Sequence, residues 1–102
     1  MSAARLQPLE GGAVRVSGEL SFETVPGLWR EAAALLAEAQ GDLAFDLQAV
    51  ERTDSAGVAL LVEWLRAAAE RGLAIQFRNI PAQLLDIARV SGVEELLSPA
   101  SV

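Results

Sequence analysis

Residues 43–61 read LAFDLQAVERTDSAGVALL, and this stretch decides the fold. Its first part, Leu43–Leu47, is short and mostly apolar, which predicts a largely buried strand. The polar segment Gln48–Thr53 is predicted to be a loop. A helix is then expected over Ser55–Arg71, because apolar residues recur there at helical spacing and Gly72 follows as a stop signal. Strand, loop and helix in succession are a unit of α/β proteins.

The segments before this unit are predicted to be two strands and a helix. Apolar spacing over residues 24–39 predicts the helix, and Pro26 suits its first turn. Ala13–Ser17 alternates apolar and polar residues, as a half-buried strand does, and Gly18 is expected to end it. Leu6–Leu9 is expected to form a short edge strand, because a proline within it cannot donate to a central ladder.

The segments after the unit continue the alternation. Leu73–Phe77 is predicted to be a strand, Ala82–Val90 a helix and Val93–Leu97 a short turn. The order is therefore β-β-α-β-α-β-α-α, and strand–helix alternation implies right-handed parallel crossovers. We expect an α/β fold with a small mixed sheet, built as a single domain over residues 1–102.

The composition excludes several classes of function. The chain has 8 basic and 14 acidic residues among 102, for a formal net charge of -6, and it contains no Cys, His or Lys. Without these residues the chain cannot form nearly all thiolate and imidazole metal sites, Ser-His nucleophile pairs or Schiff bases. An acidic chain without a basic cluster is poorly suited to nucleic acid. We predict no catalytic residue, no metal site, no cofactor and no nucleic-acid partner.

The sequence also predicts no direct insertion into a membrane. No apolar run approaches the roughly 18 residues that a spanning helix needs, and no apolar segment resembling a secretory signal follows Arg5. We therefore expect a cytoplasmic protein.

The start of the helix at Ser55 is the first candidate for a functional site. Thr53, Asp54 or Ser55 could simply cap the helix by accepting hydrogen bonds from its first N–H groups. Gly57 falls in the first turn, where it costs helix stability but allows another backbone to approach closely. A Ser hydroxyl at a helix N-terminus is also a plausible phosphate acceptor.

The apolar arc of this helix is the second candidate. Leu60 and Trp64 lie beside the main core stripe, so the arc is wider than one side facing a sheet requires. Trp64 either closes the edge of the core or anchors a partner, as Trp does at interface hot spots. Trp29 falls within the core stripe of the first helix and is expected to be buried.

The same stretch resembles the STAS domain family, which includes anti-sigma-factor antagonists and the tails of sulfate transporters. In that family Asp-Ser/Thr-x-Gly follows a strand and begins a helix, as Asp54, Ser55 and Gly57 do here. The resemblance implies a STAS-type α/β fold, a small mixed β-sheet packed by three to four α-helices.

Within the family the chain most resembles the cytoplasmic subunit of a bacterial phospholipid ABC transporter. The matching stretches are Ser17–Leu20, Pro26–Trp29, Asp54–Leu61 with Trp64, and residues 79–97. The resemblance implies a non-catalytic subunit that binds and supports the ATPase subunit and, through it, the permease complex. Such a subunit is peripheral to the inner membrane and serves outer-membrane lipid asymmetry.

The alternative implied by the resemblance is an anti-sigma-factor antagonist that is switched by phosphorylation at Ser55. Ala56 stands where many antagonists have a second Ser, which disfavours that alternative. The residues predicted to contact a partner are Thr53, Asp54, Ser55, Ala56, Gly57, Leu60 and Trp64.

Overall fold

The computed structural model describes residues 4–97, in which four strands form one mixed sheet in the order β1-β2-β3-β4. The strands are β1 (Arg5–Pro8), β2 (Ala13–Leu20), β3 (Leu43–Thr53) and β4 (Ile75–Arg78). β1 pairs with β2 in antiparallel fashion, and β2, β3 and β4 are parallel to one another. The predicted fold class, a small mixed sheet packed by helices, is confirmed.

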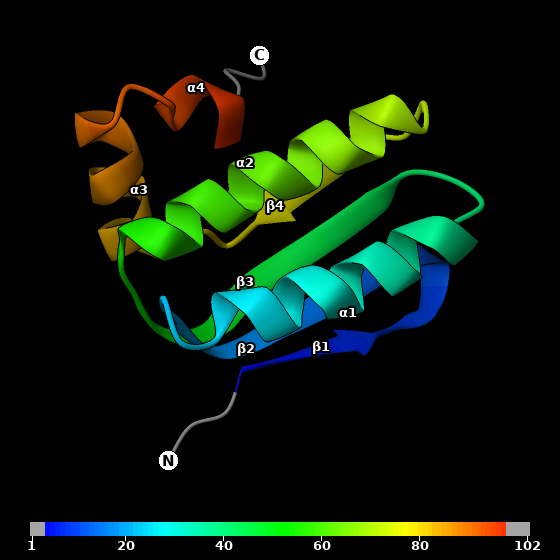
Figure 1. The fold of residues 1–102 in the computed structure, drawn as a ribbon, viewed down its shortest axis with the longest axis horizontal. Helices are drawn as coiled ribbons and strands as arrows, with labels where there is room; N and C mark the ends of the chain where they lie inside the picture. The colour runs from blue at the N-terminus through cyan, green and yellow to red at the C-terminus, as the bar shows by residue number, and fades with distance from the viewer. Residues whose placement is uncertain (1–3, 98–102) are drawn as a thin grey trace.

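One short 3-10 helix and two α-helices connect the strands, and two further α-helices follow β4. They are η1 (Glu10–Gly12), α1 (Val25–Glu38), α2 (Ser55–Glu70), α3 (Ala82–Val90) and α4 (Glu94–Leu97). Because α1 and α2 each link two parallel strands, they run in the same direction over the same face of the sheet (Figure 1). Their N-termini therefore lie at the same end of the molecule.

The core fills the space between the sheet and the helices. Phe45 of β3 lies at its centre, with its ring 4.9 Å from that of Trp64 and 6.1 Å from that of Phe77 between centroids. The other fully buried large side chains come from both layers, namely Val16, Leu20, Leu28, Leu47, Leu61, Leu84 and Leu97. Strand positions that alternate with the core residues, such as Arg15 and Gln76, are exposed on the other face of the sheet.

Two predictions about strand length are wrong. β2 does not end at Gly18 but continues to Leu20, with Gly18 buried at a φ of 90° beside a register shift against β3. The predicted loop Gln48–Thr53 is the second half of β3, paired with β2. The physical reason is that one face of the sheet is solvated, so polar residues are tolerated along the strand, while two register shifts re-align the pairing of β3 with β2.

The remaining predicted elements agree with the structure to within about two residues at their ends, which is the ordinary uncertainty of helix boundaries. Helix α3 has the predicted bounds, and α1 is one residue shorter than predicted at each end. The predicted turn Val93–Leu97 contains the short helix α4.

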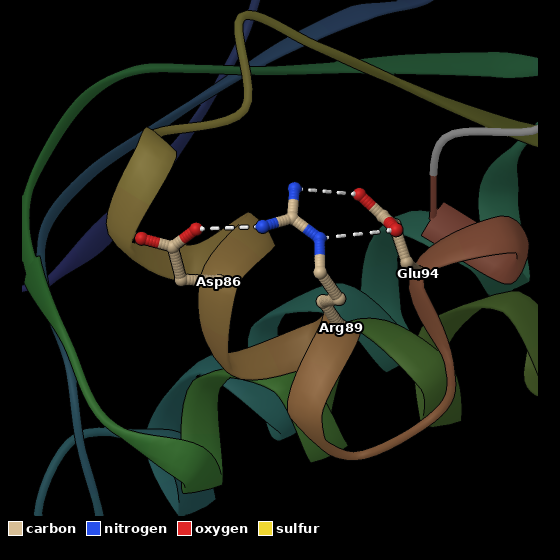
Figure 2. A network of polar contacts seen from close by, with 3 residues as sticks. All are labelled: Asp86, Arg89 and Glu94. Atoms are coloured by element: carbon tan, nitrogen blue, oxygen red, sulfur yellow. Dashed lines mark hydrogen bonds and ion pairs between the residues drawn. The ribbon is translucent and has the colours of Figure 1, made fainter.

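Helix α4 is held against α3 by a polar network around Arg89. Its guanidinium donates to both carboxylate oxygens of Glu94, at 3.5 and 3.1 Å, and to Asp86 at 3.3 Å, as Figure 2 shows. These charges raise the pKa of Arg89, first through its hydrogen bonds to Glu94. The network positions Leu97, which is buried in the core.

Candidate functional site

The carboxyl ends of β2 and β3 meet at the N-termini of α1 and α2. Leu20 and Thr53, the last residues of the two strands, are cross-strand partners, and the N–H of Asp54 donates to the carbonyl of Leu20 at 3.0 Å. Open α/β sheets commonly bind their ligands at this edge. We therefore take this end of the molecule as the candidate site.

Asp54 is the N-cap of α2. Its Oδ1 accepts a hydrogen bond from the N–H of Ala56 at 2.8 Å, which satisfies one of the unpaired donors of the first turn. Its Oδ2 accepts from the N–H of Phe22 at 3.4 Å. The carboxylate thus has a structural role, and it also ties the β2–α1 loop to the start of α2.

The β2–α1 loop is held in place by a second side chain, Thr24. Its hydroxyl donates to the carbonyl of Glu19 at 2.6 Å and accepts from the N–H of Ser21 at 3.0 Å. Together with Asp54, these bonds fix the backbone on both sides of Phe22. The loop therefore presents the Phe22 side chain, which is 74% exposed, from an ordered backbone.

Gly57 allows a close approach, but the atoms that approach it belong to Thr53 and Leu20 of the same chain. A Cβ at this position would meet the Thr53 hydroxyl and lie 2.9 Å from the Leu20 Cβ. Gly57 therefore lets α2 sit directly on the ends of β2 and β3. This packing within the chain explains why the residue is a glycine, without a close approach by the backbone of a partner.

Leu60 and Trp64 lie in the core, so of the two alternatives for Trp64 the structure agrees with closure of the core and not with an exposed anchor, while contact of either residue with a partner stays a prediction. Trp64 is completely buried and Leu60 is 2% exposed. Helix α2 packs on the sheet beneath it, on α1 at one side and on α3 and α4 at the other. Neighbouring elements of the same chain therefore cover most of its wide apolar arc.

The other predicted contact residues differ in exposure. Ser55 is exposed, Asp54 is partly exposed, and Thr53, Ala56 and Gly57 are buried where α2 meets the sheet. A contact between these residues and a partner stays a prediction. Of the set, Ser55 is the side chain that a partner could reach directly.

Trp29 contradicts the expectation of burial, because it is 36% exposed. The side of α1 that faces the sheet carries Leu28, Ala32 and Leu36, and Trp29 follows Leu28 by about 100° around the helix. Neither of the exposed aromatic residues at this end, Phe22 and Trp29, was predicted as part of the site. Phe22 could have been noticed as an aromatic residue in a polar turn between a strand and a helix.

Trp29 forms one wall of a groove between the two helices. Val25 and Trp29 from α1 face Ala59, Leu60 and Glu63 from α2 across an open space of about 340 Å³. Ser55 and Ala59, one turn apart on α2, are both exposed. Because Ala59 also lines the groove, the groove begins one helical turn from the exposed end of α2. We call the set Phe22, Val25, Trp29, Ser55, Ala59 and Glu63 the helix-end surface.

The helix-end surface carries two exposed aromatic side chains, Phe22 and Trp29. Within residues 4–97 there is no cluster of three metal-ligating side chains, and no helix is long and apolar enough to cross a membrane. Asp46, whose pKa is lowered first by a hydrogen bond from Asn79, lies on β3 and not at this surface. Exposed aromatic side chains beside a helix end are typical of protein–protein contacts.

A family model described as "Mlab, STAS domain" matches residues 4–98 of the chain. No match was found among curated protein sequences.

Several solved structures are similar to this chain. One chain of the Acinetobacter MlaFEDB complex in an ATP-bound conformation aligns with a TM-score of 0.75 and 26% identity, over 87% of this chain and 94% of that one. An anti-sigma factor antagonist from Mycobacterium paratuberculosis has a TM-score of 0.70 and 24% identity, over 96% and 84% of the two chains. The phosphorylated Bacillus cell fate determinant SpoIIAA has a TM-score of 0.69 and 18% identity, over 97% and 92%. The last two likenesses establish the fold alone.

Proposed function

Because this chain belongs to the STAS domain family and is of the MlaB type, we propose that it is the non-catalytic STAS subunit of a phospholipid ABC transporter. In this role it forms a single STAS domain that binds the ATPase subunit and supports its activity. Through the ATPase it joins the permease complex at the cytoplasmic face of the inner membrane. The transporter it serves maintains the lipid asymmetry of the outer membrane.

The observation that carries the proposal is the exposed N-terminal end of α2. Ser55 is exposed in the first turn of a 16-residue helix, and Phe22 is 74% exposed on the loop that Asp54 ties to that turn. When a partner covers a large aromatic side chain on a loop that is already ordered, little conformational entropy is lost. The similarity to a chain of the ATP-bound MlaFEDB complex supports an ABC transporter ATPase as that partner.

The first experiment is capture of the tagged protein from native membranes in mild detergent, with identification of the bound proteins by mass spectrometry. We expect an ABC ATPase and its permease. The variant Ser55→Arg should lose both, because a long cation would stand where the partner approaches. Ser91→Arg is the matched control, since Ser91 is an exposed residue at the far end of α3. Equal recovery with both variants would contradict the proposal.

A second measurement separates an activator from an enzyme. The purified chain alone should show no ATP hydrolysis, and it should raise the hydrolysis rate of the purified ATPase. Hydrolysis by the isolated chain would contradict the non-catalytic role.

The exposure of Ser55 also favours one alternative, a switch of the anti-sigma-antagonist type. A phosphate on Ser55 would lie at a helix N-terminus, although the neighbouring Asp54 carboxylate would oppose its charge. This alternative predicts a phosphorylated Ser55 in cells, a Ser55→Asp variant that binds its partner more weakly, and a soluble serine kinase or sigma regulator among the captured proteins. Unmodified Ser55 under all growth conditions would count against it.

A further inference from the structure

The groove between α1 and α2 has a shape that suits a side chain from another protein. Its floor is Leu60, and its walls are Val25 and Trp29 on one side and Ala59 on the other. All four of these residues are apolar, and the small side chain of Ala59 leaves the groove open along α2. At about 340 Å³, the space is near the lower limit for small-molecule pockets, and it is open rather than enclosed.

The charge at the groove defines what kind of partner would fit. Glu63 is the one charged residue among those that line it. Its side chain is 47% exposed, and the nearest oxygen lies 3.7 Å from the Arg66 guanidinium, which is a long ion pair between exposed groups. A cation brought by a partner would be partly desolvated as the groove is covered, and it would therefore bind the carboxylate more strongly than Arg66 does in water.

We propose that the ATPase subunit places an apolar side chain into this groove and a neighbouring Lys or Arg against Glu63. This inference rests on the proposed function. The groove begins one helical turn from Ser55, so an ATPase segment that covers the end of α2 reaches it without leaving the surface. The chain contributes the apolar walls and one carboxylate, and the partner contributes one apolar and one basic residue close together in its sequence.

The test is site-specific crosslinking followed by charge reversal. A photoreactive p-benzoylphenylalanine is placed at Ala59, which is exposed in the groove, or at the control position Ala74, which is exposed beyond the opposite end of α2. Each variant is irradiated in the membrane complex, and the crosslinked peptide is sequenced by mass spectrometry. We expect a crosslink from position 59 to an ATPase peptide that has a Lys or Arg next to a large apolar residue, and none from position 74.

The charge is tested with the purified ATPase by measuring the dissociation constant. Glu63→Arg should raise it by about tenfold or more, because like charges would then face each other at a partly buried contact. Glu70→Arg makes the same change two turns further along α2, outside the groove, and should alter it less than about twofold. Replacing the crosslinked basic residue of the ATPase by Glu should restore binding to the Glu63→Arg variant.

The possible outcomes separate this inference from the proposed function. If wild-type protein binds the ATPase but Glu63→Arg binds as well as Glu70→Arg does, the inference is wrong and the proposed function stands. A crosslink from position 59 to an acidic peptide, or to a second copy of this chain, would also overturn it. If the wild-type protein does not bind the ATPase at all, both fail.

Discussion

Gly57 is the residue on which the position of α2 depends. It lies in the first turn, against Thr53 and Leu20, and any Cβ there would overlap the Thr53 hydroxyl. Helix propensity alone would make alanine the better residue by about 1 kcal/mol. Packing against two strand ends outweighs that preference.

We predict that Gly57→Ala destabilises the fold by about 1–3 kcal/mol, as overpacked sites do. Gly27→Ala is the matched control, because Gly27 also lies early in a helix but a Cβ there meets nothing within 4 Å. The control should be neutral or stabilising by up to about 1 kcal/mol. Urea unfolding measures both, and a Gly57→Ala variant as stable as wild type would show that α2 can shift.

Trp64 is the residue whose role the structure changes most. Its ring is buried against Phe45, and its Nε1 has no hydrogen-bond partner within residues 4–97. The side chain thus contributes packing to the core and leaves one polar atom unsatisfied.

We predict that Trp64→Ala destabilises the protein by about 3–5 kcal/mol, because it leaves a large cavity in the core. Trp64→Phe should destabilise it much less, because most of the ring is kept and the removal of the unsatisfied N–H offsets part of the lost packing. Thermal and urea unfolding of the isolated chain measure the difference. If the Trp64→Ala variant keeps wild-type stability but loses partner binding, Trp64 is an anchor for the partner after all.

At the scale of elements, β3 is connected to the segment after β4 through Asp46. The carboxylate accepts hydrogen bonds from Asn79 at 3.0 Å and from the N–H of Gln48 at 2.9 Å, and Arg15 and Arg78 lie nearby. Asn79 follows β4 with a positive φ of 55°. These contacts lower the pKa of Asp46, with the bond from Asn79 as the largest cause.

A lowered pKa in the folded state has a definite consequence for stability. The unfolded chain takes up the proton first, so the stabilisation by Asp46 is fully present above its ordinary pKa of 3.8 and is lost as the pH falls through the lower, folded value. We predict that Asp46→Asn is slightly less stable than wild type at neutral pH, and that the difference disappears in acid. The free energy of unfolding of both proteins across this range is the measurement, and a difference independent of pH would contradict it.

The position of helix α4 depends on the ion pairs of Arg89. Arg89 reaches Glu94 across the turn between α3 and α4 (Figure 2). We predict that Arg89→Gln increases hydrogen exchange at the amides of α4, while those of α2 are unchanged. Added salt should have the same effect on the wild-type protein, because these groups are exposed. Unchanged exchange in the variant would show that Leu97 alone holds the helix.

At the scale of the whole molecule, binding and folding are linked. A partner that binds only the folded chain stabilises it by about 2.7 kcal/mol when its free concentration is about a hundred times the dissociation constant. We predict that the purified ATPase raises the unfolding temperature of this chain and does not raise that of Ser55→Arg. The isolated variant should unfold near the wild-type temperature, because Ser55 is exposed. A shift of equal size in both would place the contact elsewhere.

The sequence by itself determined the fold class and the order of the elements, and it limited the cap of α2 to Thr53, Asp54 or Ser55. These follow from local properties: apolar periodicity marks α1 and α2, glycines and prolines mark the turns, and Asp54 precedes a helical pattern with the side chain that caps it. The absence of Cys, His and Lys also limits the chemistry that the chain can perform, because no fold can supply a thiolate, an imidazole or an amine side chain that the sequence lacks.

The tertiary structure alone decided which of the two tryptophans is buried. A wide apolar arc on α2 is compatible with either a free surface or several neighbours, and only the packing of α1, α3 and α4 around it shows that Trp64 belongs to the core. The same packing leaves Trp29 exposed at a groove to which α1 and α2 both contribute. The burial of Trp64 and the exposure of Trp29 depend on residues far apart in the chain, so the periodicity within one helix could not have indicated them.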